Sequence, residues 1–362
     1  MRKVAVADVG GTHVRFALAD IDGGRVAALG EPVTLKTSEH GSFQLAWQEF
    51  GRRAAVELPN ELAIAFAGPV GGEVLKLTNN PWVIRPALIK ERLDVDRYTI
   101  VNDFGAVAYA VATLGDDHFQ HLCGPERALP DEGVVSIVGP GTGLGVAALL
   151  RTSGGYEVIE TEGGHIDFAP LDVLEDRILV ELRRSFRRVS VERIASGRGL
   201  WNVYEALGAI EGKSLSFHDE KELWTAALAG SDSLANAALD RVCLTLGAVA
   251  GDIALAQGAG AVVIAGGVGL RLADYLPKSG FQDRFIAKGR FERRMDEMPV
   301  KLITHPQPGL VGAAAAFAKE HGLPSTRSCA PRRSSRCSCW KARRTGRSSR
   351  RPSSPPACRS SK

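Results

Sequence analysis

The chain has 362 residues, of which 44% are hydrophobic and 24% are charged, a composition that indicates a globular protein with a large core. No run of about 18 apolar residues occurs, which excludes a membrane-spanning helix, and the first residues lead directly into a predicted strand without a signal peptide. The formal net charge of +4 arises in residues 326–362, which hold 12 Lys and Arg and no acid, whereas residues 1–325 hold 33 basic and 41 acidic residues. Only two of the six cysteines precede residue 326, so we expect a cytoplasmic protein without a disulfide framework.

The first predicted element is a hairpin whose turn is rich in glycine. A strand that begins at Val4 ends at Asp8, the turn contains Gly10, Gly11 and Thr12, and a second strand with alternating apolar residues follows His13. Glycines without a Cβ let backbone N–H groups approach a ligand such as a phosphate, and Asp8 is placed to hold a hydrated divalent metal ion. An ordinary hairpin with a Gly-Gly turn is the alternative.

Strands and helices then alternate. The spacing of apolar residues predicts helices and strands in this order: helix 42–57, strand 61–67, helix 86–93, strand 98–101 and helix 104–114. This alternation predicts an α/β fold with a mixed sheet.

Asn102 and Asp103 stand at the carboxyl end of a predicted strand. A carboxylate at this position of an open α/β sheet points into the cleft, where it can accept the proton of a substrate hydroxyl during phosphoryl transfer. The alternative role of Asp103 is to cap the predicted helix 104–114.

A second strand, Gly loop and strand occur at 133–138, 139–145 and 146–150. Because they repeat the first hairpin, we expect two related halves. A helical region over 171–257, a strand over 261–265, a third Gly loop at 266–269 and a helix over 309–319 complete the predicted elements. The loops lack the P-loop and dinucleotide-binding spacings, and together they predict a phosphate-binding cleft between two similar halves.

Two further stretches carry candidate polar ligands. Glu162-Gly-Gly-His165 puts a carboxylate and an imidazole on one Gly turn, which suits a polyol whose hydroxyls each need a donor and an acceptor. A structural histidine, a solvated acid, or a metal pair lacking a third ligand are the alternatives. Glu192 is predicted near the beginning of a helix, where an acid often serves only to interact with the helix dipole.

Residues 326–362 lose all periodicity and consist largely of Arg, Ser, Pro and Cys. Such a segment cannot bury enough apolar surface to fold. A basic nucleic-acid-binding arm is one interpretation. We favour a disordered extension or a reading-frame slip in a GC-rich gene, because nothing in residues 1–325 resembles a nucleic-acid reader.

Motifs in a fixed order resemble those of the bacterial ATP-dependent glucokinases that lack the Cys-rich zinc motif of the ROK kinases. The resemblance covers about residues 3–322 and rests on these stretches: Asp8-Val-Gly-Gly-Thr12, Leu77-Thr-Asn-Asn80, Val101-Asn-Asp-Phe104, Gly139-Pro-Gly-Thr-Gly-Leu-Gly145, Glu162-Gly-Gly-His-Ile-Asp-Phe-Ala-Pro170, Glu192-Arg-Ile-Ala-Ser-Gly197 and Ala265-Gly-Gly-Val268.

The resemblance implies a two-domain actin-like ATPase fold, of ribonuclease H-like type, with a cleft between the domains. It implies a small domain of residues 1–112 plus 308–325, a large domain of residues 113–307, and a cytosolic homodimer. The tail 326–362 has no counterpart in the family.

The family's functional residues carry over by motif. Asp103 resembles the catalytic base that takes the proton from the sugar 6-hydroxyl, and Asp8 would hold Mg²⁺ through water. The sugar ligands implied are Asn102, Asp103, Glu162, His165 and Glu192. The ATP-binding positions implied are Asp8, Gly10, Gly11, Thr12 and His13, Gly141, Thr142 and Gly143, and, for the nucleoside, Gly266 and Gly267. His13 departs from the Asn usual at its position.

The resemblance therefore implies transfer of the γ-phosphoryl group of ATP to the 6-hydroxyl of D-glucose, with Mg²⁺ as cofactor and no nucleic-acid or membrane partner. A kinase for another hexose or an amino sugar is the alternative within this class. A non-catalytic sugar-sensing regulator whose tail binds DNA is the alternative outside it, and it predicts salt-sensitive DNA affinity that deletion of 326–362 removes.

Overall fold

The computed structural model describes residues 1–77 and 80–322, which belong to one compact unit. The basic segment 326–362, for which we expect no folded structure, lies outside the described residues. Within the ranges 1–77 and 80–322, no helix is long and apolar enough to cross a membrane.

The first sheet begins with the predicted N-terminal hairpin. Its strands run in the order β3-β2-β1-β5-β8, with β4 paired to β2; β1 pairs antiparallel with β2 and parallel with β5. These strands are β1 (Arg2–Val9), β2 (His13–Asp22), β3 (Arg25–Leu29), β4 (Val33–Lys36), β5 (Glu61–Phe66) and β8 (Arg97–Asn102). A short pair, β6 (Leu75–Lys76) and β7 (Val83–Ile84), stands apart from this sheet.

The second sheet repeats this arrangement. Its order is β12-β11-β10-β13-β14-β9, so that again an antiparallel three-strand meander is followed by two parallel strands. The strands are β9 (Phe119–Cys123), β10 (Gly133–Pro140), β11 (Leu144–Thr152), β12 (Gly155–Thr161), β13 (Ala261–Ile264) and β14 (Val300–Ile303). The prediction of two related halves is confirmed by this shared topology.

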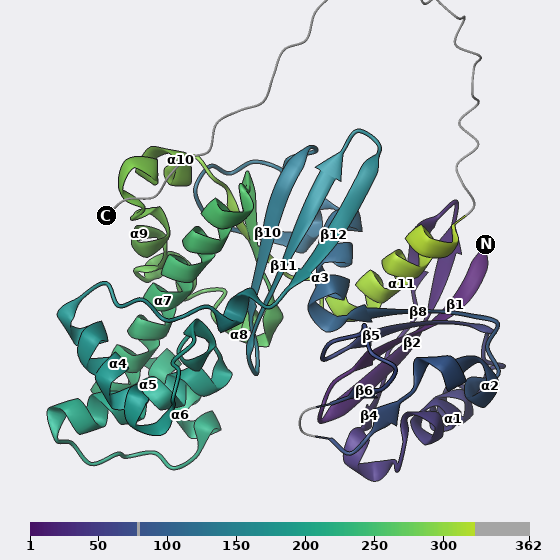
Figure 1. Ribbon diagram of the computed structural model, residues 1–362, viewed down its shortest axis with the longest axis horizontal. Helices are drawn as coiled ribbons and strands as arrows, with labels where there is room; N and C mark the ends of the chain where they lie inside the picture. The colour runs from purple at the N-terminus through teal and green to yellow at the C-terminus, as the bar shows by residue number, and fades with distance from the viewer. Residues whose placement is uncertain (78–79, 323–362) are drawn as a thin grey trace, which may run out of the picture. The chain divides into compact units, whose positions relative to one another are not determined.

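The last helix of each half packs against the sheet of the other half. Helix α3 (Asp103–Thr113) follows β8 but packs against β11 and β12, and helix α11 (Pro308–His321) follows β14 but packs against β1 and β5. The two helices also pack against each other (Figure 1). A Cβ on Gly312 would lie 1.6 Å from the Ala106 carbonyl oxygen, so the backbones meet without a side chain between them.

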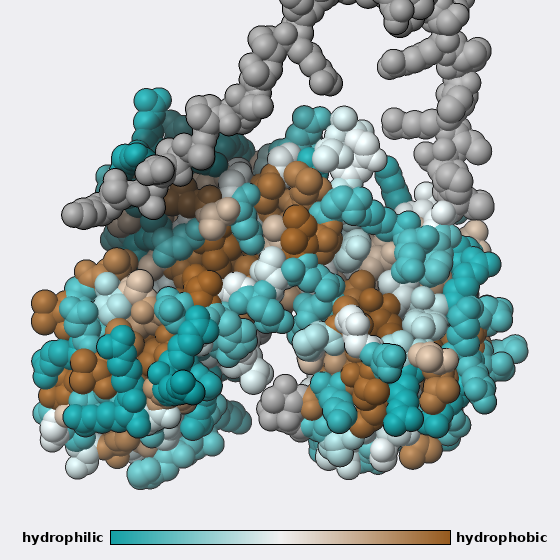
Figure 2. Space-filling model, viewed as in Figure 1, coloured by the Kyte–Doolittle hydropathy of each residue, from teal (hydrophilic) through white to brown (hydrophobic). Residues whose placement is uncertain are grey.

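A group of helices packs against the second sheet and forms the larger part of the second half. The helical region predicted over 171–257 is confirmed as α4 (Val173–Ser185), α5 (Gly197–Glu211), α6 (Glu220–Ala229) and α7 (Ser233–Gln257), and the shorter α8 (Gly266–Arg271), α9 (Phe281–Ile286) and α10 (Glu292–Asp296) follow. The third Gly loop predicted over 266–269 is wrong, because these residues form the first turn of α8. They share one hydrophobic core with β10, β13 and β14. Their outer surface, at lower left in Figure 2, mixes polar and hydrophobic areas, as expected for helices that bury one face.

Two predicted helices of the first half have different bounds in the structure. Helix α1 (Phe43–Ala54) begins after its N-cap Ser42 and ends where Ala55 adopts a left-handed φ of 51°. The helix predicted over 86–93 is confirmed as a helical segment, but residues 86–88 form a 3₁₀ turn, so that its α-helical part, α2 (Ile89–Leu93), begins three residues later. Pro86 has no N–H to donate, and the amide of Leu88 bonds back to Arg85.

The close crossing of α3 and α11 is testable by adding one methyl group. We expect Gly312→Ala to lower the free energy of unfolding by about 3 kcal/mol or more, because the helices must separate. Gly71→Ala is the matched control, since its Cβ would meet nothing within 4 Å. Urea denaturation of both variants measures the difference, and equal losses in the two would contradict the crossing.

Candidate active site

Asp103 is the first residue of α3, and Asn102 is the residue that caps the helix. The Asn102 Oδ1 accepts hydrogen bonds from the amides of Phe104 and Gly105, at 2.9 and 3.2 Å. The alternative reading of Asp103 as the helix cap is therefore wrong by one residue. Asp103 Oδ1 accepts a hydrogen bond from the Phe104 amide at 2.9 Å.

Burial is the main cause that raises the pKa of Asp103 to about 6. The hydrogen bond from Phe104 opposes this rise, and the negative charges of Asp8 and Glu162 add to it. A carboxyl group with this pKa is ionised at neutral pH and is basic enough to accept a proton from a hydroxyl in a transition state.

Both polar atoms of the Asn102 side chain, Oδ1 and Nδ2, form hydrogen bonds within the protein. Its Nδ2 donates to the Gly68 carbonyl at 3.2 Å, while its backbone amide donates to Glu160 Oε1 at 2.9 Å. Glu160 also explains Gly105, because a Cβ there would lie 2.3 Å from the Glu160 carboxylate. Glu160 lies on β12, two residues before the Glu162-Gly-Gly-His165 motif, and nothing in the sequence marks it as a partner of Asn102.

Asp8 lies at the end of β1, beside the beginning of α11. Its Oδ2 accepts a hydrogen bond from Arg15 Nη1 at 3.4 Å, and a Cβ on Gly309 would lie 3.1 Å from the carboxylate. Burial raises the pKa of Asp8, against the opposing charge of Arg15. Arg15, which the sequence analysis did not select, stands opposite Asp8 in the hairpin register.

The first Gly loop turns its carbonyl groups into the protein. The Gly11 carbonyl accepts hydrogen bonds from Thr37 Oγ1 at 2.7 Å and from Asn80 Nδ2 at 3.0 Å, and the Thr12 carbonyl accepts one from the Thr37 amide at 3.0 Å. The His13 carbonyl accepts from the Gly10 amide at 3.0 Å. No hydrogen bond among the described residues uses the amides of Gly11 and Thr12, which suits a loop that binds an anion.

The second Gly loop is tied to α5 and to Glu192. The Gly141 carbonyl accepts from the Gly197 amide at 2.7 Å, and Glu192 Oε2 accepts from the Leu144 amide at 2.9 Å. The prediction that Glu192 lies at the opening of a helix is wrong, because it lies on a 3₁₀ turn and α5 begins at Gly197 with Ser196 as its cap. A Cβ on Gly143 would lie 2.3 Å from the Glu192 carboxylate.

Glu162 precedes the 3₁₀ turn η4 (Gly163–His165), and His165 is its last residue. This turn lies against the backbone of Leu144. The closest approach of their side chains is 3.9 Å, between His165 Nε2 and Glu162 Oε2, and both side chains are exposed. A Cβ on Gly164 would lie 1.9 Å from the Leu144 carbonyl oxygen. Leu144 therefore joins the turn of Glu162 and His165 to Glu192 and to the second Gly loop.

A cavity of about 1130 Å³ brings together several predicted residues from distant parts of the chain. Asp103, Gly141, Thr142, Gly266 and Gly267 line it, whereas the other predicted site residues are not among its lining residues. It also contains residues that the sequence analysis missed: Arg15, Phe104, Gly197, Arg198, Glu220, Lys221, Trp224, Thr225, Leu228, Val268 and Arg271.

The missed residues include an aromatic and basic wall on α6 and α8. The guanidinium carbon of Arg271 lies 5.0 Å from the centre of the Trp224 ring, and Trp224 Nε1 donates to the Gly197 carbonyl at 3.2 Å. Trp224 and Arg271 lie in helices and belong to none of the predicted site motifs, so the sequence around them does not mark them as site residues. In the described residues, no group of three or more His, Cys, Asp or Glu side chains is arranged to hold a metal ion.

A family model described as Glucokinase matches residues 5–320. This chain belongs to the glucokinase family. The glucokinase of Zymomonas mobilis subsp. mobilis is 63% identical over 319 residues, which cover 88% of this chain and 98% of the Zymomonas sequence. The glucokinase of Caulobacter vibrioides strain NA1000 is 39% identical over 319 residues, covering 87% of this chain and 95% of that sequence.

Solved structures agree with this membership of the glucokinase family. A glucokinase from an Antarctic psychrotroph has a TM-score of 0.77 and 32% identity, covering 88% of this chain and 99% of that chain. A ROK family glucokinase from Streptomyces griseus, solved in complex with glucose and AMPPNP, has a TM-score of 0.57 at 20% identity, covering 86% and 98%, and this likeness concerns the fold alone. The predicted fold class, that of the actin-like ATPases, is confirmed.

The raised pKa of Asp103 predicts how this site affects stability. Since the folded-state pKa of about 6 exceeds the ordinary 3.8, the group's contribution to stability is full below pH 3.8 and is lost as the pH rises through 6. We expect Asp103→Asn to be more stable than the unsubstituted protein at pH 8 by about 1–3 kcal/mol, and equally stable near pH 4. Urea denaturation at both pH values measures this, with the exposed Asp22→Asn as control; an effect independent of pH would contradict it.

Proposed function

We propose that this chain transfers the γ-phosphoryl group of ATP to the 6-hydroxyl of D-glucose, giving glucose 6-phosphate and ADP. The observation that carries the proposal is Asp103, a partly buried carboxylate with a pKa of about 6, which lines the same cavity as Gly141 and Thr142 of the second Gly loop and Gly266 and Gly267 at the beginning of α8. The 63% identity to the Zymomonas glucokinase supports glucose as the sugar.

Asp103 acts as the general base in this proposal. The Phe104 amide holds its Oδ1, so that the carboxylate keeps one orientation while it takes the proton of the sugar hydroxyl. The proposed sugar ligands are Asn102, Glu162, His165 and Glu192. Asn102 also caps α3, and through the cap it orients the carboxylate beside it.

The proposed ATP site combines the Gly loops with the cavity of about 1130 Å³. Gly10, Gly11, Thr12 and His13 form the first phosphate loop, and Gly141, Thr142 and Gly143 form the second. Gly266 and Gly267 face the nucleoside, for which Trp224 offers an aromatic surface next to Arg271. Three basic residues that line the same cavity offset the negative charge of the triphosphate: Arg15, Arg198 and Lys221.

Asp8 is the residue that we propose to hold Mg²⁺, through water. A partly buried carboxylate whose pKa is raised gains from a nearby cation, and Mg²⁺ in kinases needs only one or two protein carboxylates beside phosphates and water. When bound, Mg²⁺ neutralises charge on the transferred phosphoryl group.

The division into residues 1–112 plus 308–325 and residues 113–307 stays a proposal, as do the cytosolic homodimer and the sugar roles above. The packing of α11 against β1 and β5 supports placing residues 308–321 with the first half, whereas α3, which this division counts with the first half, packs against β11 and β12 of the second.

Sugar selectivity tests the function directly. We expect ADP formation, measured in a coupled assay, to depend on added sugar, with kcat/KM higher for glucose than for mannose, fructose or N-acetylglucosamine. A higher kcat/KM for mannose, fructose or N-acetylglucosamine would make that sugar the substrate in place of glucose. ADP formation that does not respond to any of the four sugars would reject a hexose kinase.

Asp103→Asn tests the general base. We expect kcat to fall by about 10² to 10⁴-fold while glucose binding changes little, because an amide cannot accept the proton. In the unsubstituted enzyme kcat/KM for glucose, which reports ionisation of the free enzyme, should fall tenfold per pH unit below about pH 6, where Asp103 becomes protonated. Near-normal turnover by the variant, or a flat profile between pH 5 and 7, would leave Asp103 with a structural role only.

A further inference from the structure

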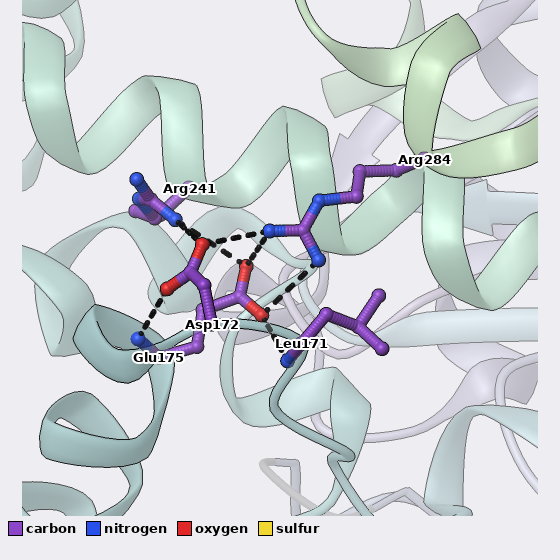
Figure 3. Close-up of polar contacts among 5 residues, drawn as sticks. All are labelled: Leu171, Asp172, Glu175, Arg241 and Arg284. Carbon is purple, nitrogen blue, oxygen red and sulfur yellow. Dashed lines mark hydrogen bonds and ion pairs between the residues drawn. The ribbon is translucent and has the colours of Figure 1, made fainter. Parts of the chain in front are cut away.

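A network of charged side chains lies at the end of the loop that follows Glu162 and His165. Figure 3 shows its members, Asp172, Glu175, Arg241 and Arg284, together with Leu171. Arg284 Nη2 lies 2.8 Å from Asp172 Oδ2 and 3.2 Å from Glu175 Oε1, and Arg241 Nη1 also pairs with both acids. Two carboxylates thus face two guanidinium groups. The network joins α4 to α7 and α9.

The network holds the end of that loop in place. The Leu171 amide donates to Glu175 Oε2 at 2.7 Å, and the Glu175 amide donates to Asp172 Oδ1 at 2.9 Å. Residues 171 and 172 are therefore tied to the first turn of α4, six residues after His165.

The other side of the loop is tied to the segment that carries Glu192. The Phe168 amide donates to the Val189 carbonyl and the Val191 amide donates to the Ile166 carbonyl, each at 3.0 Å. A shift of residues 166–171 would therefore move Glu162 and His165 on one side and Glu192 on the other.

A small cavity of about 30 Å³ lies between this loop and α7. Glu175 and Thr245 line it, together with residues that include Ile166, Phe168 and Val249. Glu175 is 2% exposed and Thr245 is 4% exposed. Glu175 Oε1 and Thr245 Oγ1 are both buried without a hydrogen-bond partner, although Glu175 Oε1 keeps its ionic contact with Arg284.

We propose that one water molecule binds in this cavity and bridges Glu175 Oε1 and Thr245 Oγ1, and that Glu175 and Thr245 are positioning residues for the sugar-binding loop. The second part rests on the proposed function. A cavity of about this size suits a single water, and buried polar atoms of native proteins are normally satisfied by protein or ordered water. A cation is not called for, because Arg241 and Arg284 already balance Asp172 and Glu175.

Two substitutions at Thr245 separate its hydroxyl from its shape. Thr245→Val keeps the volume but removes the hydroxyl, whereas Thr245→Ser keeps the hydroxyl. We expect Thr245→Val to raise KM for glucose about threefold to tenfold, the size of effect of one lost buried hydrogen bond. KM for ATP and kcat should change less than KM for glucose does, because the second Gly loop is connected to the displaced segment only through Leu144 and Glu192. Thr245→Ser should restore KM for glucose to within twofold.

An unchanged KM for glucose in Thr245→Val would overturn the positioning role, and so would equal effects of the two substitutions or an equal rise in KM for ATP. Thermal unfolding of both variants shows that the folded fraction is the same in each assay.

A crystal structure of the unsubstituted protein tests the water independently of activity. One ordered water within hydrogen-bond distance of both oxygen atoms supports the proposal. A dry cavity, with the Thr245 hydroxyl turned to the Arg241 carbonyl one turn earlier, overturns it. If the unsubstituted protein fails to phosphorylate glucose, the proposed function fails, and the crystal structure still decides whether the water is bound.

Discussion

The position of the catalytic machinery depends on the crossing of α3 and α11. Gly312 allows α11 to approach the Ala106 carbonyl on α3 without an intervening side chain. The first turn of α3 carries Asp103, and the first turn of α11 places Gly309 against Asp8. Because each helix packs against the sheet of the other half, this one contact sets both carboxylates relative to both Gly hairpins.

The site gathers negative charge around a partly buried carboxylate. The carboxylates of Asp8 and Glu162 both raise the pKa of Asp103, although burial is the larger cause, and among the described residues Arg15 pairs with Asp8. This arrangement lowers the stability of the ionised folded protein. The same negative charges make Asp103 more basic, which in the function proposed above favours its role as proton acceptor and the binding of Mg²⁺ beside Asp8.

Close backbone approaches explain why glycine stands where it does around Leu144. Its carbonyl leaves no room for a side chain at Gly164, and the Glu192 carboxylate that binds its amide leaves none at Gly143. The sugar side and the phosphate side of the proposed site are thereby built on the same strand end. The charged network of Asp172, Glu175, Arg241 and Arg284 stabilises the outer part of this arrangement.

What the sequence by itself determined is local: the two Gly hairpins, the strand that delivers Asp103, the α/β class and the family. Alternating apolar residues and glycine turns involve only a few consecutive positions, so the sequence predicts them without a structure. Tertiary structure alone decided that Asn102 and not Asp103 caps α3, since both types cap helices and the boundary differs by one residue. It alone revealed partners whose contacts arise from packing and leave no local pattern: Glu160 at Asn102, Arg271 at Trp224, and Thr245 on the cavity that Glu175 also lines.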